Sequence, residues 1–216
     1  MKYAALLFLS LFLMACHQSS RTATPVKPLI QNMDSYYKTD KDRTIHFART
    51  VKDSMGIHYL EGSISFDKVH NAVQHITKHE IIPPQRINTL LSDLKERNYK
   101  EGFDQYDKIL FVQLHPDPGH EMKVLSRRQS LETKIHNELY RRNLGEWVAG
   151  DLGPGGANML FSVKDEEKAL NLIMHLLQNE GILHHTLIAR RLYFSPHEWN
   201  YEILYPIDFS GTFNQM

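Results

Sequence analysis

Histidine and aspartate side chains follow one predicted strand and precede another in the second half of the chain. In an antiparallel split βαβ sheet, the end of the first strand and the start of the fourth lie at the same edge. Imidazole and carboxylate groups are ligands that suit zinc, and clustered histidines respond to pH. The sequence therefore predicts a metal site or a pH-sensitive patch made of His115, Asp117, His120, His184 and His185.

A second histidine pair, His75 and His79, is spaced by four residues. The apolar residues Val69, Val73 and Ile76 have helical spacing, and a helix would place both imidazoles on one face. Two ligands do not complete a zinc site, and no glutamate stands where a metalloprotease helix needs one. We interpret the pair as a solvated helix face, with a metal site as the alternative.

The glycine-rich segment 150–156 is the third candidate for chemistry. A phosphate loop would continue into a Lys-Ser/Thr pair and a helix, whereas a strand is predicted to follow here. We interpret the segment as a wide hairpin turn whose polar side chains cap it locally. Tryptophan and tyrosine are favoured at protein interfaces, so a partner surface is also predicted, with candidate residues Trp147, Asp151, Gly153, Gly155, Asn158 and Trp199.

No catalytic residue is predicted. The chain has no Gly-x-Ser-x-Gly elbow, and no serine can be assigned a histidine and a carboxylate. Glu166 and Glu167 are adjacent at a helix start and point in different directions. An enzyme is the less favoured class.

The elements that position these residues are clearest in the second half. Apolar runs predict strands at 109–115, 146–151, 158–163 and 186–194. Two helical stripes alternate with them: Leu131, Ile135 and Leu139, and then a stripe after Asp165, which stands at an N-cap position. The order β-α-β-β-α-β predicts an α+β fold with a ferredoxin-like antiparallel sheet and two helices on one face.

The first half predicts a smaller α+β lobe. Strand-like runs at 44–51 and 57–64 flank a turn and form a hairpin. Two amphipathic helices follow: the one with His75 and His79, and one after Pro83 and Pro84. Whether the two halves share one core, and to which half residues 199–209 add a strand, are left open by the sequence.

Composition limits the function classes. Lys plus Arg and Asp plus Glu number 25 each among 216 residues, which does not favour a nucleic-acid surface. The chain has one cysteine, Cys16. If its thiol is consumed, the mature chain can form neither a disulfide nor a thiolate metal site.

The first sixteen residues carry a targeting pattern. Lys2 precedes an apolar stretch that is too short to span a bilayer, as in a secretory signal peptide. The motif Leu13-Met14-Ala15-Cys16 resembles the lipobox of bacterial lipoproteins. The resemblance implies cleavage before Cys16, diacylglycerol on its thiol and a fatty acyl chain such as palmitate on the new amine. The alternative is an ordinary signal peptide with a free thiol.

The position after the lipidated cysteine bears on the destination. In Gram-negative lipoproteins an aspartate there usually signals retention in the inner membrane, and this chain has His17. The resemblance therefore implies an outer-membrane anchor with the body in the periplasm. We predict a signal peptide at 1–15, a lipidated tether at 16–35, an α+β lobe at 36–105 and a ferredoxin-like domain at 106–216.

These patterns favour a non-catalytic, membrane-anchored protein-binding module. The run from Leu144 to Phe161, with the Asp-capped helix after it, is similar to small bacterial α/β domains, some of which are immunity proteins. The sharper hypothesis is therefore an immunity protein that neutralises an envelope-targeting toxin. The alternative is an envelope hydrolase or metal-binding protein that uses the histidine edge. No cofactor is expected beyond the lipid, and zinc belongs to the alternative.

Overall fold

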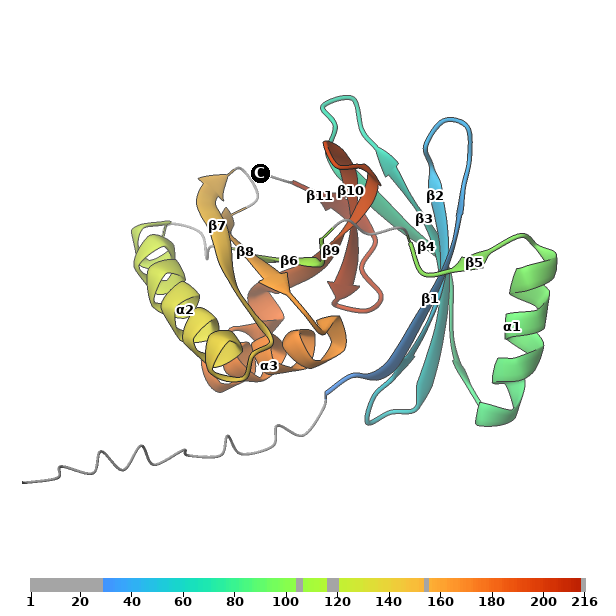
Figure 1. Ribbon diagram of the computed structural model, residues 1–216, viewed down its shortest axis with the longest axis horizontal. Coiled ribbons are helices and arrows are strands. Elements are labelled where there is room, and N and C mark those ends of the chain that lie inside the picture. The colour runs from blue at the N-terminus through green and yellow to red at the C-terminus, as the bar shows by residue number, and fades with distance from the viewer. Residues whose placement is uncertain (1–28, 104–106, 116–120, 154–155, 215–216) are drawn as a thin grey trace, which may run out of the picture.

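The computed structural model describes residues 29–103, 107–115, 121–153 and 156–214. It is a mixed α+β fold with two antiparallel sheets. Figure 1 shows the layers: α1 covers the outer face of one sheet, and α2 and α3 cover the far face of the other. Three-residue 3-10 helices, Pro84–Arg86 and Leu183–His185, precede α1 and β9. The helices are α1 (Ile87–Glu96), α2 (Glu121–Arg141) and α3 (Glu166–Asn179).

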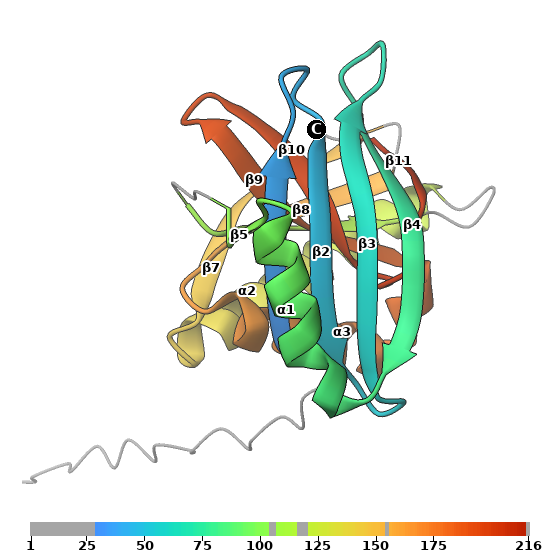
Figure 2. The same cartoon turned by 90° about the vertical axis from the view of Figure 1, so that its right-hand side faces the viewer.

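The first sheet has the strand order β11-β4-β3-β2-β1-β5. Figure 2 shows α1 lying across its outer face. Leu90 and Leu94 of α1 pack there against Tyr36, Ala48 and Tyr59. The strands are β1 (Gln31–Thr39), β2 (Ile45–Lys52), β3 (Ile57–Phe66), β4 (Ala72–Ile82), β5 (Lys100–Glu101) and β11 (Gly211–Phe213).

The second sheet has the order β10-β9-β6-β8-β7. Alternate residues of β6 face opposite layers, as a strand buried on both sides requires. Phe111 faces the first sheet, whereas Leu110 and Val112 belong to the core under the helices. The strands are β6 (Ile109–Leu114), β7 (Gly145–Gly153), β8 (Gly156–Val163), β9 (Thr186–Ser195) and β10 (Glu198–Tyr205).

The predicted hairpin at 44–51 and 57–64 is confirmed as β2 and β3, which pair in register from Ile45 to Lys52. The helix predicted around His75 and His79 is wrong. Residues 72–82 form β4, which pairs with β3 along its whole length. Three apolar residues at helical spacing are a short signal, and the β-branched residues of this segment favour a strand once β3 offers hydrogen bonds.

The predicted tether at 16–35 is too long, because β1 begins at Gln31. The chain is already held at Leu29 and Ile30, whose N–H groups donate to Asn171 Oδ1 at 2.7 and 2.8 Å. The Asn171 amide returns a hydrogen bond to the Ile30 carbonyl. Polar residues along 31–35 hid this strand, although its main partner, β2, follows it directly in the chain.

The helices and strands predicted for the second half are present, and Asp165 caps α3 by accepting a hydrogen bond from the Lys168 N–H. The sheets are larger than predicted. Residues 198–205 add β10 to the second sheet, and β11 returns to pair with β4 of the first. The two halves share one core, in which Phe47, Phe111 and Phe213 are fully buried together.

Candidate functional site

The predicted histidine edge is partly assembled. The His115 N–H donates to the His185 carbonyl at 2.9 Å, and the rings of His184 and His185 lie 4.0 Å apart. Partial burial, with the nearby His185, lowers the pKa of His115. Asp117 and His120 lie outside the described residues. Within the described ranges, no group of three or more His, Cys, Asp or Glu side chains is placed to hold a metal ion.

His79 has a different neighbour from the one predicted. His75 and His79 lie on strand β4, and His79 Nε2 is 2.9 Å from Nδ1 of the buried His58. On its other side, His58 Nε2 is 3.0 Å from Asp53 Oδ1. The ring centres of the two histidines are 5.2 Å apart, which matches two nitrogens pointing directly at one another. The Asp53–His58–His79 chain of contacts braces the turn before β3.

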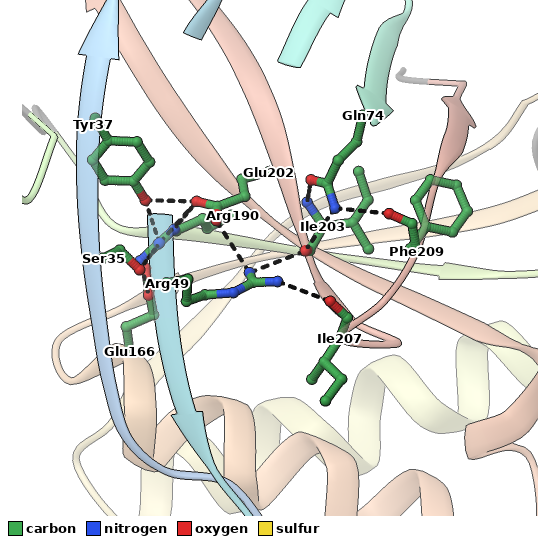
Figure 3. A network of polar contacts seen from close by, with 10 residues as sticks. All are labelled: Ser35, Tyr37, Arg49, Gln74, Glu166, Arg190, Glu202, Ile203, Ile207 and Phe209. Carbon is green, nitrogen blue, oxygen red and sulfur yellow. Dashed lines mark hydrogen bonds and ion pairs between the residues drawn. The ribbon is translucent and has the colours of Figure 1, made fainter. Parts of the chain in front are cut away.

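A buried polar network joins the two sheets (Figure 3). Its centre is Glu202 of β10, which is fully buried. Glu202 accepts hydrogen bonds from the Tyr37 hydroxyl at 2.6 Å, from Arg190 Nε at 2.8 Å and from Arg49 Nη1 at 3.1 Å. Arg190 also donates to Glu166 of α3 at 2.9 Å. Two arginines therefore face two carboxylates, and the charges balance.

The same network fixes the segment after β10. Arg49 donates to the carbonyls of Ile203 and Ile207 at 3.1 and 3.2 Å. Gln74 accepts from the Ile203 N–H and donates to the Phe209 carbonyl. Burial opposes the charge of Glu202, but Arg190, Arg49 and the Tyr37 hydroxyl outweigh it and hold the pKa of Glu202 below its ordinary value. With its charges paired and buried, this network is a structural joint between the sheets.

The surface formed by α2 and β7 differs from this buried polar network because it exposes apolar side chains to solvent. Seven large apolar side chains are exposed among the described residues, and four of them lie here: Tyr140, Trp147, Val148 and Leu152. Val148 and Leu152 are 48% and 53% exposed. Clustered exposed apolar side chains mark binding surfaces more often than single ones do. We call residues 132–140 of α2 together with β7 the α2–β7 surface.

Two hollows flank β7 on this surface. One of about 290 Å³ is lined by Glu132, Thr133, His136 and Trp147. The other, of about 490 Å³, lies past the end of α2 and is lined by Tyr140, Asn143, Gly145, Glu146, Ser162 and Lys164. The His136 ring stacks on Tyr140, and its Nδ1 lies 3.1 Å from the Trp147 backbone nitrogen. His136 of α2 thus positions both the Tyr140 ring and the backbone at Trp147.

A glycine allows α2 to approach β7 closely. A Cβ atom at Gly150 would lie 2.2 Å from Glu132 Oε1 and 2.8 Å from Arg128 Nη1. These two side chains form an ion pair at 3.1 Å and are largely buried against the strand. Burial raises the pKa of Glu132, although the Arg128 charge opposes the rise.

The residues predicted for partner binding do not form one group in the structure. Trp147 is exposed, Asp151 is partly exposed, and Gly153 pairs with Gly156 at the end of β7. Asn158 is fully buried between Asp151 and Gln113, so its side chain holds the hairpin together. Trp199 lies elsewhere, stacked on Arg191 at 4.2 Å. Gly155 lies outside the described residues.

The sequence prediction missed Tyr140, Val148, Leu152 and His136. Tyr140 follows the buried Leu139, and only the orientation of α2 shows that it points to solvent beside β7. Comparisons with known proteins add nothing to the site: no family model, no curated protein and no solved structure matches this chain. Across the described residues, none of the helices has the length and apolar content needed to span a membrane.

Proposed function

We propose that this chain is a lipid-anchored protein of the bacterial outer membrane that binds a protein partner in the periplasm through the α2–β7 surface. The observation that carries the proposal is the concentration of exposed apolar side chains on and beside one sheet edge. The other exposed large apolar side chains among the described residues, Met55, Val69 and Ile81, lie on the first sheet and its turns.

The anchor in this proposal is the lipobox-like sequence ending at Cys16. Twelve residues lie between Cys16 and Leu29, where the body is held by Asn171. Fully extended, such a segment spans at most about 45 Å. The body would stay close to the membrane, and the partner would meet it at a high local concentration.

The more specific proposal is that the partner is a toxin acting on the envelope, so that this chain is an immunity protein. Its second half would be a ferredoxin-like unit extended by one strand. The order β9-β6-β8-β7, with α2 after β6 and α3 after β8, supports that layout. Deleting the gene in cells that meet the toxin should cause lysis or growth arrest. Normal growth of the deletion strain would contradict this part.

The surface itself is tested by two matched substitutions in the full lipidated protein, used as bait in solubilised envelopes. Leu152→Lys places a charge on the α2–β7 surface, and Ile81→Lys places one at an equally exposed apolar residue of β4, since their exposures are 53% and 55%. A stoichiometric partner should be retained by the wild type and by Ile81→Lys but lost from Leu152→Lys. Equal retention by both variants would refute the proposed surface.

A second candidate function is an envelope hydrolase or zinc-binding protein at the histidine edge. The observation that favours it is the contact between His115 and His185. Replacing both with alanine should abolish such an activity and zinc uptake, whereas it should leave binding at the α2–β7 surface unchanged. Zinc uptake unchanged by this double replacement would contradict a metal role for the pair.

A further inference from the structure

The outermost strands are β5 and β11 in the first sheet and β10 and β7 in the second. β5 and β11 end the first sheet with two and three residues, and β10 has a run of five buried residues from Asn200 to Leu204. The fourth edge is β7, which has nine residues and contains no lysine, arginine or proline. Figure 1 shows β7 at the end of its sheet, and no described segment pairs with its outer side. Soluble proteins rarely leave a long edge strand open, because its free N–H and C=O groups pair with other chains.

Part of this edge is occupied by the protein itself. The Trp147 N–H is covered by His136, and the register with β8 shifts between Trp147 and Ala149. A bulge of this kind interrupts pairing on the strand that contains it. The stretch beyond the bulge, Ala149–Gly153, pairs regularly with β8 on one side and ends the sheet on the other.

The two faces of β7 differ in character. Trp147, Gly150 and Leu152 pair with residues of β8 that belong to the core under the helices, so they share the face covered by α2. Glu146 and Asp151 pair with Ser162 and Asn158 and lie on the opposite face. An added strand would therefore meet apolar side chains and the 290 Å³ hollow on one face, and carboxylates on the other.

Glu146 and Asp151 are not paired with a cation in the part of the chain that the structure describes. Asp151 accepts a hydrogen bond from the neutral Asn158 amide. Two copies of this chain joined at β7 would place four carboxylates on one face of a continuous sheet. Their repulsion disfavours self-association and favours a partner of opposite charge.

We propose that an extended segment of the partner adds to β7 as a further strand, with lysine or arginine facing Glu146 and Asp151 and apolar residues facing Trp147 and Leu152. This inference rests on the proposed binding function and specifies how that function is carried out. Main-chain hydrogen bonds supply affinity in strand addition, and alternate side chains supply specificity.

The experiment uses synthetic peptides of alternating valine and lysine, with valine–glutamate peptides and proline-containing versions as controls. Binding to the full chain is followed by calorimetry, and hydrogen exchange of the amides of residues 149–153 is measured with and without peptide. We expect the lysine peptide to bind, to slow exchange at these amides and to lose affinity when proline interrupts it.

Charge variants test the assignment of the two faces. In the variant Glu146→Gln/Asp151→Asn, whose second change keeps an acceptor for Asn158, affinity for the lysine peptide should fall about tenfold, the effect of two exposed ion pairs. Lysine at both positions should transfer the preference to the glutamate peptide. The control Asp93→Lys/Glu96→Lys, on α1, should change neither affinity. Ala149→Pro should weaken both peptides by blocking the edge.

The outcomes distinguish strand addition at β7 from the broader proposal that the α2–β7 surface binds a partner. Failure of the lysine peptide to bind, equal binding of both peptides, or protection outside β7 would overturn strand addition. If the envelope partner is nevertheless lost from Leu152→Lys, the binding surface stands without this mode of binding. A concentration-dependent dimer formed through β7 would instead assign the edge to a second copy and refute the basic partner.

Discussion

The joint around Glu202 and the α2–β7 surface both contain charged groups beside apolar ones. The two regions differ in how these charges are paired. At the joint, Glu202 meets Arg49 and Arg190 in the interior, and each ion has an opposite partner. On the surface, Glu146 and Asp151 stand beside Trp147 and Leu152 without an internal cation among the described residues. Under the proposed function, the difference separates charged groups that hold the fold from charged groups that bind a partner.

The largest expected effect breaks the joint. Glu202→Ala leaves Arg49 and Arg190 buried without their shared anion, and we expect a loss of about 3 to 5 kcal/mol in the free energy of unfolding. Urea denaturation measures it. Glu202→Gln, which keeps an acceptor for the Tyr37 hydroxyl, should lose less. A loss below about 1 kcal/mol for the alanine variant would show that the joint contributes little to the stability of the fold.

Acid tests the same joint. Because the pKa of Glu202 is lower in the folded chain, unfolding takes up a proton at this group as the pH falls. The stabilisation that ionised Glu202 gives to the fold is complete above its ordinary pKa of 4.5. This stabilisation is lost as the pH falls through the lower pKa of the folded state. The stability advantage of the wild type over Glu202→Gln should therefore be constant above about pH 5 and shrink as the pH falls from 4.5 through the lower folded value. A constant difference between the two proteins across this range would contradict the assignment.

A middle-sized effect concerns the start of the folded body. Asn171→Ala removes the acceptor for the Leu29 and Ile30 N–H groups, and we expect a loss of about 1 to 3 kcal/mol. Limited proteolysis should then cleave near residue 30 more rapidly. Asn179→Ala, at the exposed end of the same helix, is the control and should leave both properties unchanged.

The smallest expected effect on stability is at the surface. Trp147→Ala should change the free energy of unfolding by less than about 1 kcal/mol, because the side chain is 43% exposed, yet it should remove most partner binding. Tyr201→Ala removes a fully buried aromatic side chain, so it should destabilise the fold without removing a contact of the α2–β7 surface. A Trp147→Ala variant as unstable as Tyr201→Ala would place Trp147 in the core and weaken the comparison.

The sequence predicted the elements that depend on local signals. The stripe Leu131, Ile135 and Leu139 and the Asp165 cap require only neighbours in the chain, and both are present. β11 pairs with β4, far earlier in the chain, so its three residues gave no local signal. β1 and β4 pair with the neighbouring strands β2 and β3, but polar residues in β1 and helically spaced apolar residues in β4 gave weak or misleading signals. Pairing within a sheet overrides local propensity.

The residues of the proposed surface depend on packing as well as on residue type. Trp147 and Asp151 were selected by residue type, whereas the burial of Asn158 depends on Gln113 of another strand and has no local signal in the sequence. Arg49 and Arg190 stand inside apolar strands, where a charged residue indicates either an edge or a buried partner. Only the packing of the two sheets shows that Glu202 is that partner.

Residues near the two ends of the folded chain pack in different parts of the interior, and this affects how the protein folds during synthesis. Ile30, near the start of the body, packs in the core under α2 and α3, whereas Phe213 packs with Phe47 between the sheets. Neither half can complete its interior while the other is still unsynthesised. Folding of this kind has a high contact order and is slow. The chain would reach its native state only after residue 213 is available, and until then it would be a substrate for chaperones and proteases.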